Sequence, residues 1–280
     1  MEFFHLINIL YEKVLVEPIL NLLMFFYHFL TLAHVPGALG LAIILLTAAI
    51  RMILWPLTTT QLKSSQKMAA LKPHLDRIKK EHGQDKLRHQ QEVSKLYKSH
   101  GINPAAGCLP LILQIPVFIA LYRTLTNIVD FNKADYLDAI NSKIHLSFIN
   151  LDKIPDTSFI GFHLADRPNQ WAQIGLLILA IPLITGILQY IQSKMLIAPN
   201  VSKVLTKAKE KEGMEDAMAS MQSQMTLIMP AMIAFFSYGF PVGLSLYWNT
   251  FTVFGIIQQY LISGAGSLNQ YLPKKWQKQS

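Results

Sequence analysis

Arg51 is the residue whose type and position most clearly imply chemistry. It stands in the stretch "TAAIRMILWPLTTTQ" (47–61), directly after the uncharged apolar run "VPGALGLAIILL". A cation in such a helix is costly unless its side chain reaches the polar surface or faces a water-filled cavity. Arg51 lies about 16 Å along a helix from Gly40, at roughly 1.5 Å per residue, and Pro56 marks the end of the apolar run. Geometry alone leaves open whether Arg51 snorkels to the surface or lines a cavity between helices.

Uncharged polar residues recur in the other apolar stretches, and none of these stretches contains Asp or Glu. An ion-coupled carrier usually places a carboxylate within its membrane-spanning helices. One cation with many uncharged polar residues and no acid therefore favours a water-filled, positively charged groove over a closed ion site. Thr47 lies one helical turn before Arg51 on the same face. The candidate groove residues are Arg51, Thr47, Gln114, Thr185, Gln189, Gln192, Tyr247, Trp248 and Gln258. Asn249 is a further polar residue of the last apolar stretch.

Enzymatic and metal chemistry have no support in the sequence. We find no phosphate-binding glycine loop, no His/Glu metal spacing and no nucleophile motif. The nine histidines are scattered, and the single cysteine, Cys108, excludes an internal disulfide. We therefore expect a protein that is not an enzyme and that needs no cofactor.

Composition indicates an integral membrane protein. Of the 280 residues, 51% are hydrophobic and only 15% are charged, against about 25% charged in a soluble domain, and the mean hydropathy is +0.30. The net charge of +8 could indicate nucleic-acid binding. The basic residues, however, cluster between apolar spans, as the positive-inside rule predicts for cytoplasmic loops.

The sequence predicts an all-α membrane protein with five transmembrane helices, because each long apolar zone suits the roughly 20 residues of a span. The zone 225–262 is too long for one span and breaks at "SYGFPVG" (237–243). The predicted spans are 35–57, 105–129, 171–192, 225–239 and 243–262. Between and beside them we expect an N-terminal segment 1–34, a helical hairpin 58–104, an extracytoplasmic segment 130–170, a loop 193–224 and a short basic tail 263–280.

The earlier apolar stretch 14–33 contains Glu17, Pro18, Asn21 and His28 and makes a poor span. Three-and-four spacing puts Leu20, Leu23, Met24 and Tyr27 on one face. We expect an amphipathic helix that lies in the membrane interface, with a sixth span as the alternative.

Lysine and arginine counts predict the orientation. The segment 58–104 has ten of them against four acids, whereas 130–170 has four against six acids. Basic loops stay in the cytoplasm. The N-terminus is thus expected outside, with the hairpin and the C-terminus inside.

The 58–104 segment predicts two helices with a thin apolar seam, formed by Leu71, Leu75 and Ile78 in the first and by Leu87, Val93 and Leu96 in the second. Gly83 suits the turn between them, and Pro73 should begin or kink the first helix. The charged exterior has two interpretations. It is either a solvated face or a contact surface for anionic lipids or a partner such as the ribosome.

Three stretches carry a family resemblance: "RMILWPLTTTQLKSSQKMAALKPHLDRIKKEHG", "INPAAGCLPLILQIPVFIALYRTL" and "FPVGLSLYWNTFTVFGIIQQYLI". The chain resembles the YidC-type membrane protein insertases, bacterial relatives of the mitochondrial oxidase-assembly and chloroplast Albino insertases. The resemblance implies a five-helix core with a hydrophilic groove open to the cytoplasm and to lipid. It maps the family's groove arginine onto Arg51, the preceding threonine onto Thr47 and the aromatic residue of the last span onto Trp248.

The expected function is therefore membrane protein insertion in the bacterial inner membrane. Nascent membrane proteins are the expected clients, and the lipid bilayer is the acceptor of their helices. The resemblance also implies contacts of the 58–104 hairpin with the Sec translocon, the signal recognition pathway or the ribosome. An assembly chaperone without translocation and a small-anion transporter are the alternatives.

Overall fold

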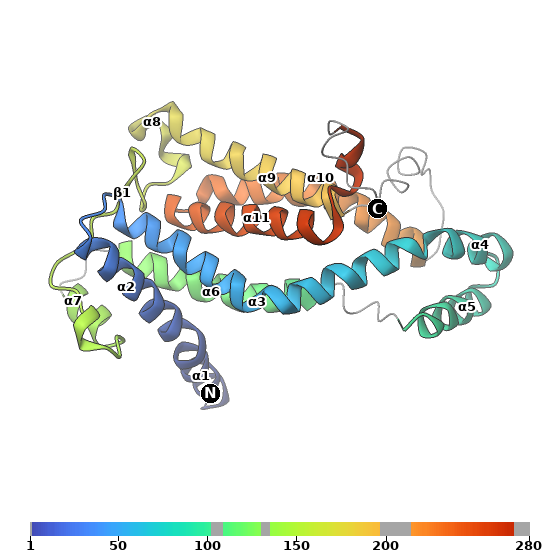
Figure 1. Cartoon of the computed structure of the whole chain (residues 1–280), viewed down its shortest axis with the longest axis horizontal. Coiled ribbons are helices and arrows are strands. Elements are labelled where there is room, and N and C mark those ends of the chain that lie inside the picture. The colour runs from blue at the N-terminus through green and yellow to red at the C-terminus, as the bar shows by residue number, and fades with distance from the viewer. Residues whose placement is uncertain (1, 102–108, 130–134, 197–213, 272–280) are drawn as a thin grey trace. The chain divides into compact units, whose positions relative to one another are not determined.

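The computed structural model describes residues 2–101, 109–129, 135–196 and 214–271 (Figure 1). The chain divides into two compact units. Unit 1 comprises Met1–Ile53, Ile112–Thr185 and Ile233–Phe251. Unit 2 comprises Leu54–Leu111, Gly186–Met232 and Thr252–Ser280. Cys108 and most of the predicted 193–224 loop lie outside the described residues.

Unit 1 begins with α1 (Glu2–Tyr11), a π-helical turn (Glu12–Val16) and α2 (Glu17–Leu32). The α2 face predicted to be apolar is buried, because Leu23 and Met24 are fully covered and their face neighbours nearly so. The run Phe4–Leu32 is nevertheless long and apolar enough to cross a membrane. Its placement in the interface therefore stays a prediction.

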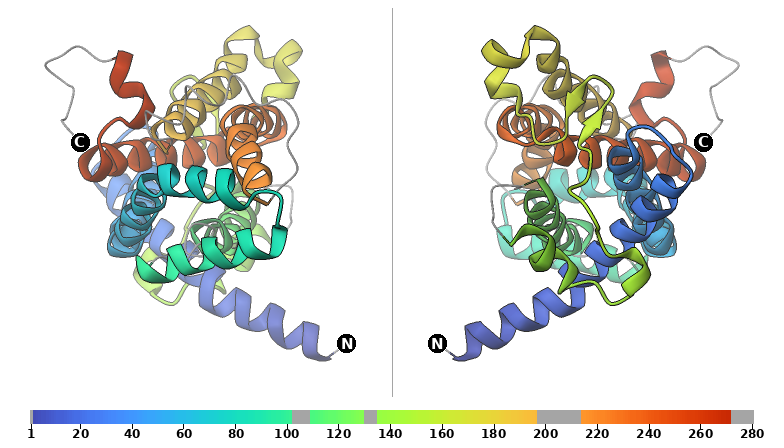
Figure 2. Two further views of the ribbon diagram at one scale, coloured as in Figure 1. Left: turned by 90° about the vertical axis from the view of Figure 1, so that its right-hand side faces the viewer. Right: turned by 90° about the vertical axis from the view of Figure 1, so that its left-hand side faces the viewer.

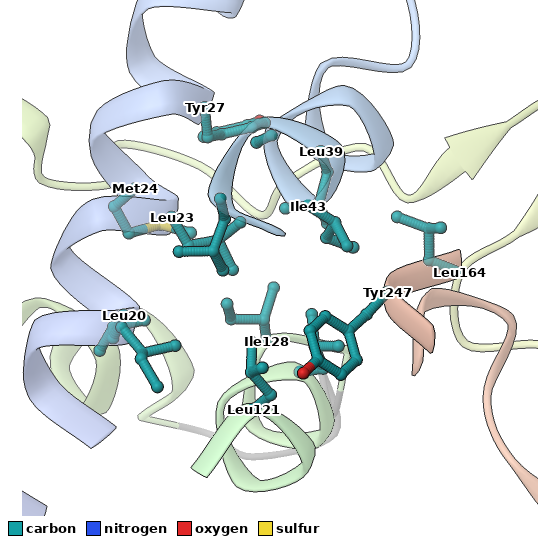
Figure 3. Close-up of a cluster of buried hydrophobic side chains, with 14 of the residues drawn as sticks. Leu20, Leu23, Met24, Tyr27, Leu39, Ile43, Leu121, Ile128, Leu164 and Tyr247 are labelled. Carbon is teal, nitrogen blue, oxygen red and sulfur yellow. The ribbon is translucent and has the colours of Figure 1, made fainter. Parts of the chain in front are cut away.

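The core of unit 1 brings α2 against α3 (Ala38–Ala70), α6 (Leu109–Val129) and the start of α11 (Val242–Ser263) (Figure 3). Leu39 and Ile43 of α3 face Leu121 and Ile128 of α6, and the Tyr247 ring of α11 closes the cluster. Within unit 1, these helices are thus packed together mainly by aliphatic side chains.

The segment after α6 contains several short elements of secondary structure. It contains α7 (Tyr136–Asn141), the antiparallel pair β1 (Ser158–Phe159) and β2 (Phe162–His163), and α8 (Trp171–Ile174). Ile160 and Gly161 both have positive φ, of 48° and 82°, which suits a two-residue hairpin loop. This strand pair, visible in the right-hand view of Figure 2, is a local exception to the all-α prediction. Three 3₁₀ turns complete the segment: Ser147–Ile149, Pro168–Gln170 and Leu176–Leu179.

The strand pair is anchored in unit 1 by backbone and ring contacts. The Val242 amide donates to the Asp166 carbonyl at 2.8 Å and the Gly243 amide to the Leu164 carbonyl at 2.9 Å. The Phe159 ring occupies the space beside Gly40, where a Cβ atom would lie only 2.2 Å from the ring. Only glycine at this position of α3 permits so close an approach.

Unit 2 contains α4 (Lys72–His82) and α5 (Lys86–Ser99), which lie side by side in the left-hand view of Figure 2. Pro73 occupies the first turn of α4, and Gly83 is its C-cap. Leu71 is buried and most of the predicted seam is half-buried, but Leu87 is 70% exposed. Including Leu87 in the seam was wrong, because six residues along the helix place its side chain about 120° around the helix axis from that of Val93.

The remaining helices are α9 (Ala180–Leu196), α10 (Met214–Gly239) and α11, followed by a 3₁₀ turn (Gly266–Tyr271). By length and composition, three helices of the described chain could cross a membrane: Phe4–Leu32, Ala38–Met68 and Leu176–Leu196. Leu227–Gly239 is a shorter apolar helix. The helices α3, α6, α9, α10 and α11 overlap the five predicted spans, whose number stays a prediction.

Candidate functional site around Arg51

Arg51 lies inside unit 1 with only 6% of its surface exposed. Its Nη2 donates a hydrogen bond of 2.6 Å to the backbone carbonyl of Phe251. The guanidinium carbon also lies 3.4 Å from the centroid of the Phe251 ring. Its Nε has no hydrogen-bond partner, and no carboxylate of the described residues forms an ion pair with it. Arg51 is therefore a buried cation held by neutral groups.

The chemistry of Phe251 explains how a neutral residue can hold this cation. A helical carbonyl oxygen has two lone pairs, so it can accept from its own helix and from a side chain. The ring adds the negative face of its π-system, which attracts a guanidinium by about 2 kcal/mol where water is excluded. Together these contacts fix the side chain without removing its charge, which arginine retains at any physiological pH.

A ring contact and a hydrogen bond connect Phe251 to α6. Tyr247 lies one turn before Phe251 on α11, and their ring centroids are 5.9 Å apart. The fully buried Tyr247 hydroxyl accepts a 2.7 Å hydrogen bond from Gln114 Nε2. The structure thus connects three of the predicted residues, Arg51, Tyr247 and Gln114, through one that the sequence analysis missed.

Thr47 and Thr185 are buried, but neither accepts a hydrogen bond from Arg51. The Thr47 hydroxyl donates to the Ile43 carbonyl of its own helix at 2.6 Å. The Thr185 hydroxyl donates to Ile181 at 2.8 Å and lies 3.3 Å from the Ser237 hydroxyl. Ser237 in turn lies 3.0 Å from Ser245, so a second polar cluster joins α9, α10 and α11 within unit 1.

Trp248 is half-buried and meets the Phe118 ring of α6 edge-on, with centroids 5.4 Å apart. Three further predicted residues, Gln258, Gln189 and Gln192, belong to unit 2. Gln258 is 1% exposed, and its amide nitrogen donates to the Trp55 carbonyl and to the Thr58 and Thr59 hydroxyls of α3 at 2.6–3.2 Å. Gln189 is buried and Gln192 is half-buried on α9. Asn249 is half-buried in unit 1.

Three contributors escaped sequence reasoning, and each for a physical reason. Phe251 acts through a backbone carbonyl and a ring face, which no search for polar side chains finds. Ser237 and Ser245 are small hydroxyl residues in apolar helices, and such residues commonly mark close helix contacts in membrane proteins. That pattern could have pointed to both serines.

A second arginine within the predicted spans, Arg123, has an acidic partner. Its Nη1 forms a 2.9 Å ion pair with Glu12. The same carboxylate lies 3.3 Å from Lys143 Nζ. The carboxylate comes from outside the predicted spans, which is why a search within the spans did not find it.

Comparison with known proteins identifies the family. The sequence profile of the family described as "60Kd inner membrane protein" matches residues 31–268. The chain belongs to this family. This confirms the resemblance to the YidC-type proteins, and with the candidate spans it identifies a multi-pass inner-membrane protein.

The chain is similar to "Membrane protein insertase YidC" of Nitratidesulfovibrio vulgaris, with 30% identity over 254 residues, 91% of this chain and 39% of that protein. The Rickettsia conorii protein of the same name is 32% identical over 251 residues, 89% of this chain and 39% of its own length. The chain therefore spans about two fifths of the length of these curated relatives.

A solved structure titled "Active YidC insertase crystal structure with the first transmembrane domain resolved" is also similar. Its TM-score is 0.53 at 25% identity, and the match covers 90% of this chain and 46% of that one.

Proposed function

We propose that this chain is a membrane protein insertase that moves short polar segments of nascent membrane proteins across the inner membrane. The buried cation Arg51, held by neutral groups only, carries the proposal. Membership of a family whose compared members are named insertases supports it. No nucleotide or metal is required by the mechanism.

In this mechanism the guanidinium of Arg51 attracts the acidic extracytoplasmic part of a client. Arginine has five N–H donors, and only one of them donates to a described residue, Phe251. A carboxylate that replaces the Phe251 contacts gains a charge-assisted hydrogen bond of about 1.5–3 kcal/mol. The client is thereby held in a polar environment that lowers the barrier to moving its polar part through the bilayer.

The remaining predicted groove residues provide uncharged polar contacts for the client backbone. The apolar helix of the client then leaves sideways into lipid, where each buried CH₂ contributes roughly 0.8 kcal/mol. The basic helices α4 and α5 face the cytoplasm in this proposal and are candidates for contact with the ribosome, the signal recognition pathway or the Sec translocon.

Replacement of Arg51 tests the charge-capture step. In proteoliposomes, Arg51→Ala should reduce insertion of a client with a short acidic tail by roughly tenfold or more, equivalent to at least about 1.4 kcal/mol. Arg51→Lys should retain most of the activity because it keeps the charge. A client with the same helix and a neutral tail serves as control and should insert almost equally in both variants.

Normal insertion of every client by Arg51→Ala would remove the role assigned to the charge. Site-specific crosslinking of a stalled nascent client to residue 248 then separates insertion from transport. An insertase gives a crosslink to the client, whereas a small-anion transporter gives none.

A further inference from the structure

A cavity of about 180 Å³ lies in unit 1, away from Arg51, among the π-helical turn Glu12–Val16, α2, α6, α7 and the residues that follow α7. Its walls are mostly apolar and include Val16, Leu20 and Ile140. Apolar cavities on the order of 150 Å³ stay free of water and bind molecules the size of benzene. This cavity therefore has room for several methylene groups.

Two polar groups of α6 line the same cavity. The Thr124 side chain is only 2% exposed, and its hydroxyl has no hydrogen-bond partner in the described part of the chain. A buried hydroxyl without a partner is unfavourable by about 1–3 kcal/mol, so the site suits a ligand that brings an acceptor. Asn127, half-buried one turn further along α6, adds an amide.

Lys143 gives the cavity a cationic edge. Its ammonium group shares the Glu12 carboxylate with Arg123, at 3.3 and 2.9 Å. Two cations and one carboxylate leave these three contacting groups with a net charge of +1. Asn21 fixes this region by donating to the Lys143 carbonyl and accepting from the His145 amide. An anionic group near Lys143 would complete the charge balance.

Tyr136 forms part of the cavity wall, and its uncharged hydroxyl acts as a hydrogen-bond donor. Its hydroxyl donates to the Ile128 carbonyl at 2.6 Å. Burial raises the pKa of Tyr136 above its usual range, so the ring stays uncharged beside the cavity. The apolar wall is thereby preserved at every physiological pH.

We propose that this cavity binds one phospholipid, with the start of an acyl chain inside it. The ester carbonyl accepts from Thr124, and the phosphate lies against Lys143. A lipid is the favoured occupant because the adjoining run Phe4–Leu32 is apolar enough for a membrane, and its outward residues Phe25 and Phe29 are exposed. The lipid fills the gap between α2 and α7. This inference is independent of the proposed insertase function.

The test uses the full chain reconstituted in phosphatidylcholine vesicles that contain phosphatidylglycerol with a diazirine near the start of one acyl chain. After irradiation, we expect label in peptides that contain residues 16–20 and 136–143. Thr124→Val is almost isosteric and removes the donor, so labelling should fall roughly two- to tenfold. Thr126→Val is the matched control, because Thr126 donates to its own helix at Tyr122.

Lys143→Gln should lower the same labelling by up to about fivefold, whereas Lys153→Gln, at an exposed lysine of the same segment, should leave it unchanged. Wild-type labelling in Thr124→Val, or label spread evenly over all exposed apolar helices, would overturn the proposal. Displacement of the probe by millimolar inorganic phosphate would also overturn it, since the site would then bind the free anion and not the lipid.

Discussion

At the scale of single residues, Arg51 is notable for what surrounds it. A buried cation without an acidic partner is retained only where other groups compensate for lost hydration. Phe251 supplies two such groups, its carbonyl and its ring face. The sequence was sufficient to single out Arg51, because a charge in an apolar run is visible in one dimension. Its partner was not visible, because any of the apolar residues of α11 could have faced it.

The ring contact can be measured by a double-mutant cycle of Phe251→Leu and Arg51→Ala. The backbone carbonyl remains in Phe251→Leu, so the cycle isolates the ring, and we expect a coupling of about 0.5–2 kcal/mol in the free energy of unfolding. Denaturant unfolding in detergent provides the measurement. Phe254→Leu, at a half-buried residue of the same helix, is the control and should couple to Arg51 by less than about 0.3 kcal/mol. Equal coupling for both would assign no special role to the ring.

At the scale of elements, the strand pair and α3 are matched by shape. Phe159 of β1 lies where any side chain of residue 40 would lie. Only the approximate positions of the long helices could be predicted from apolar runs and from Gly and Pro breaks, since α3 continues to Ala70 and α9 begins at Ala180. The strand pair could not, because strands of two residues leave no hydrophobic alternation to detect. Its formation depends on contacts with α3 and α11 that are distant in the chain.

Gly40→Ala tests this fit. The new Cβ would lie 2.2 Å from a Phe159 ring carbon, so the ring must move, and we expect a loss of about 1–3 kcal/mol in unfolding free energy. The loss should shrink in a Phe159→Ala background, where the obstructing ring is absent. Gly239→Ala is the control, since nothing lies within 4 Å of its added Cβ. Equal thermal stability of Gly40→Ala and wild type would mean that Phe159 does not pack there.

At the scale of the whole molecule, the open question is the number of membrane crossings. Loop charges predict an outside N-terminus and an inside α4–α5 pair, and this holds for five spans with an interfacial α2. The run Phe4–Leu32 nevertheless has the length and hydropathy of a span. Glu17 and Asn21 argue against a span by their polarity alone. In the structure, however, both side chains have partners, so they do not exclude a span. Polar residues that find partners are less unfavourable in a membrane than their side chains alone imply.

Single-cysteine labelling distinguishes the two arrangements. In a Cys108→Ser background, cysteine replaces one of the exposed residues His5, Ser94 or Asp152, and intact cells or right-side-out vesicles are treated with a membrane-impermeant maleimide. The five-span arrangement predicts labelling at 5 and 152 from outside and at 94 only after permeabilisation. If residues 4–32 cross the membrane, position 5 lies inside and, like position 94, is labelled only after permeabilisation. Labelling at position 94 from outside would contradict the predicted orientation. The ten basic residues of the 58–104 segment would then lie outside the cell, against the positive-inside rule.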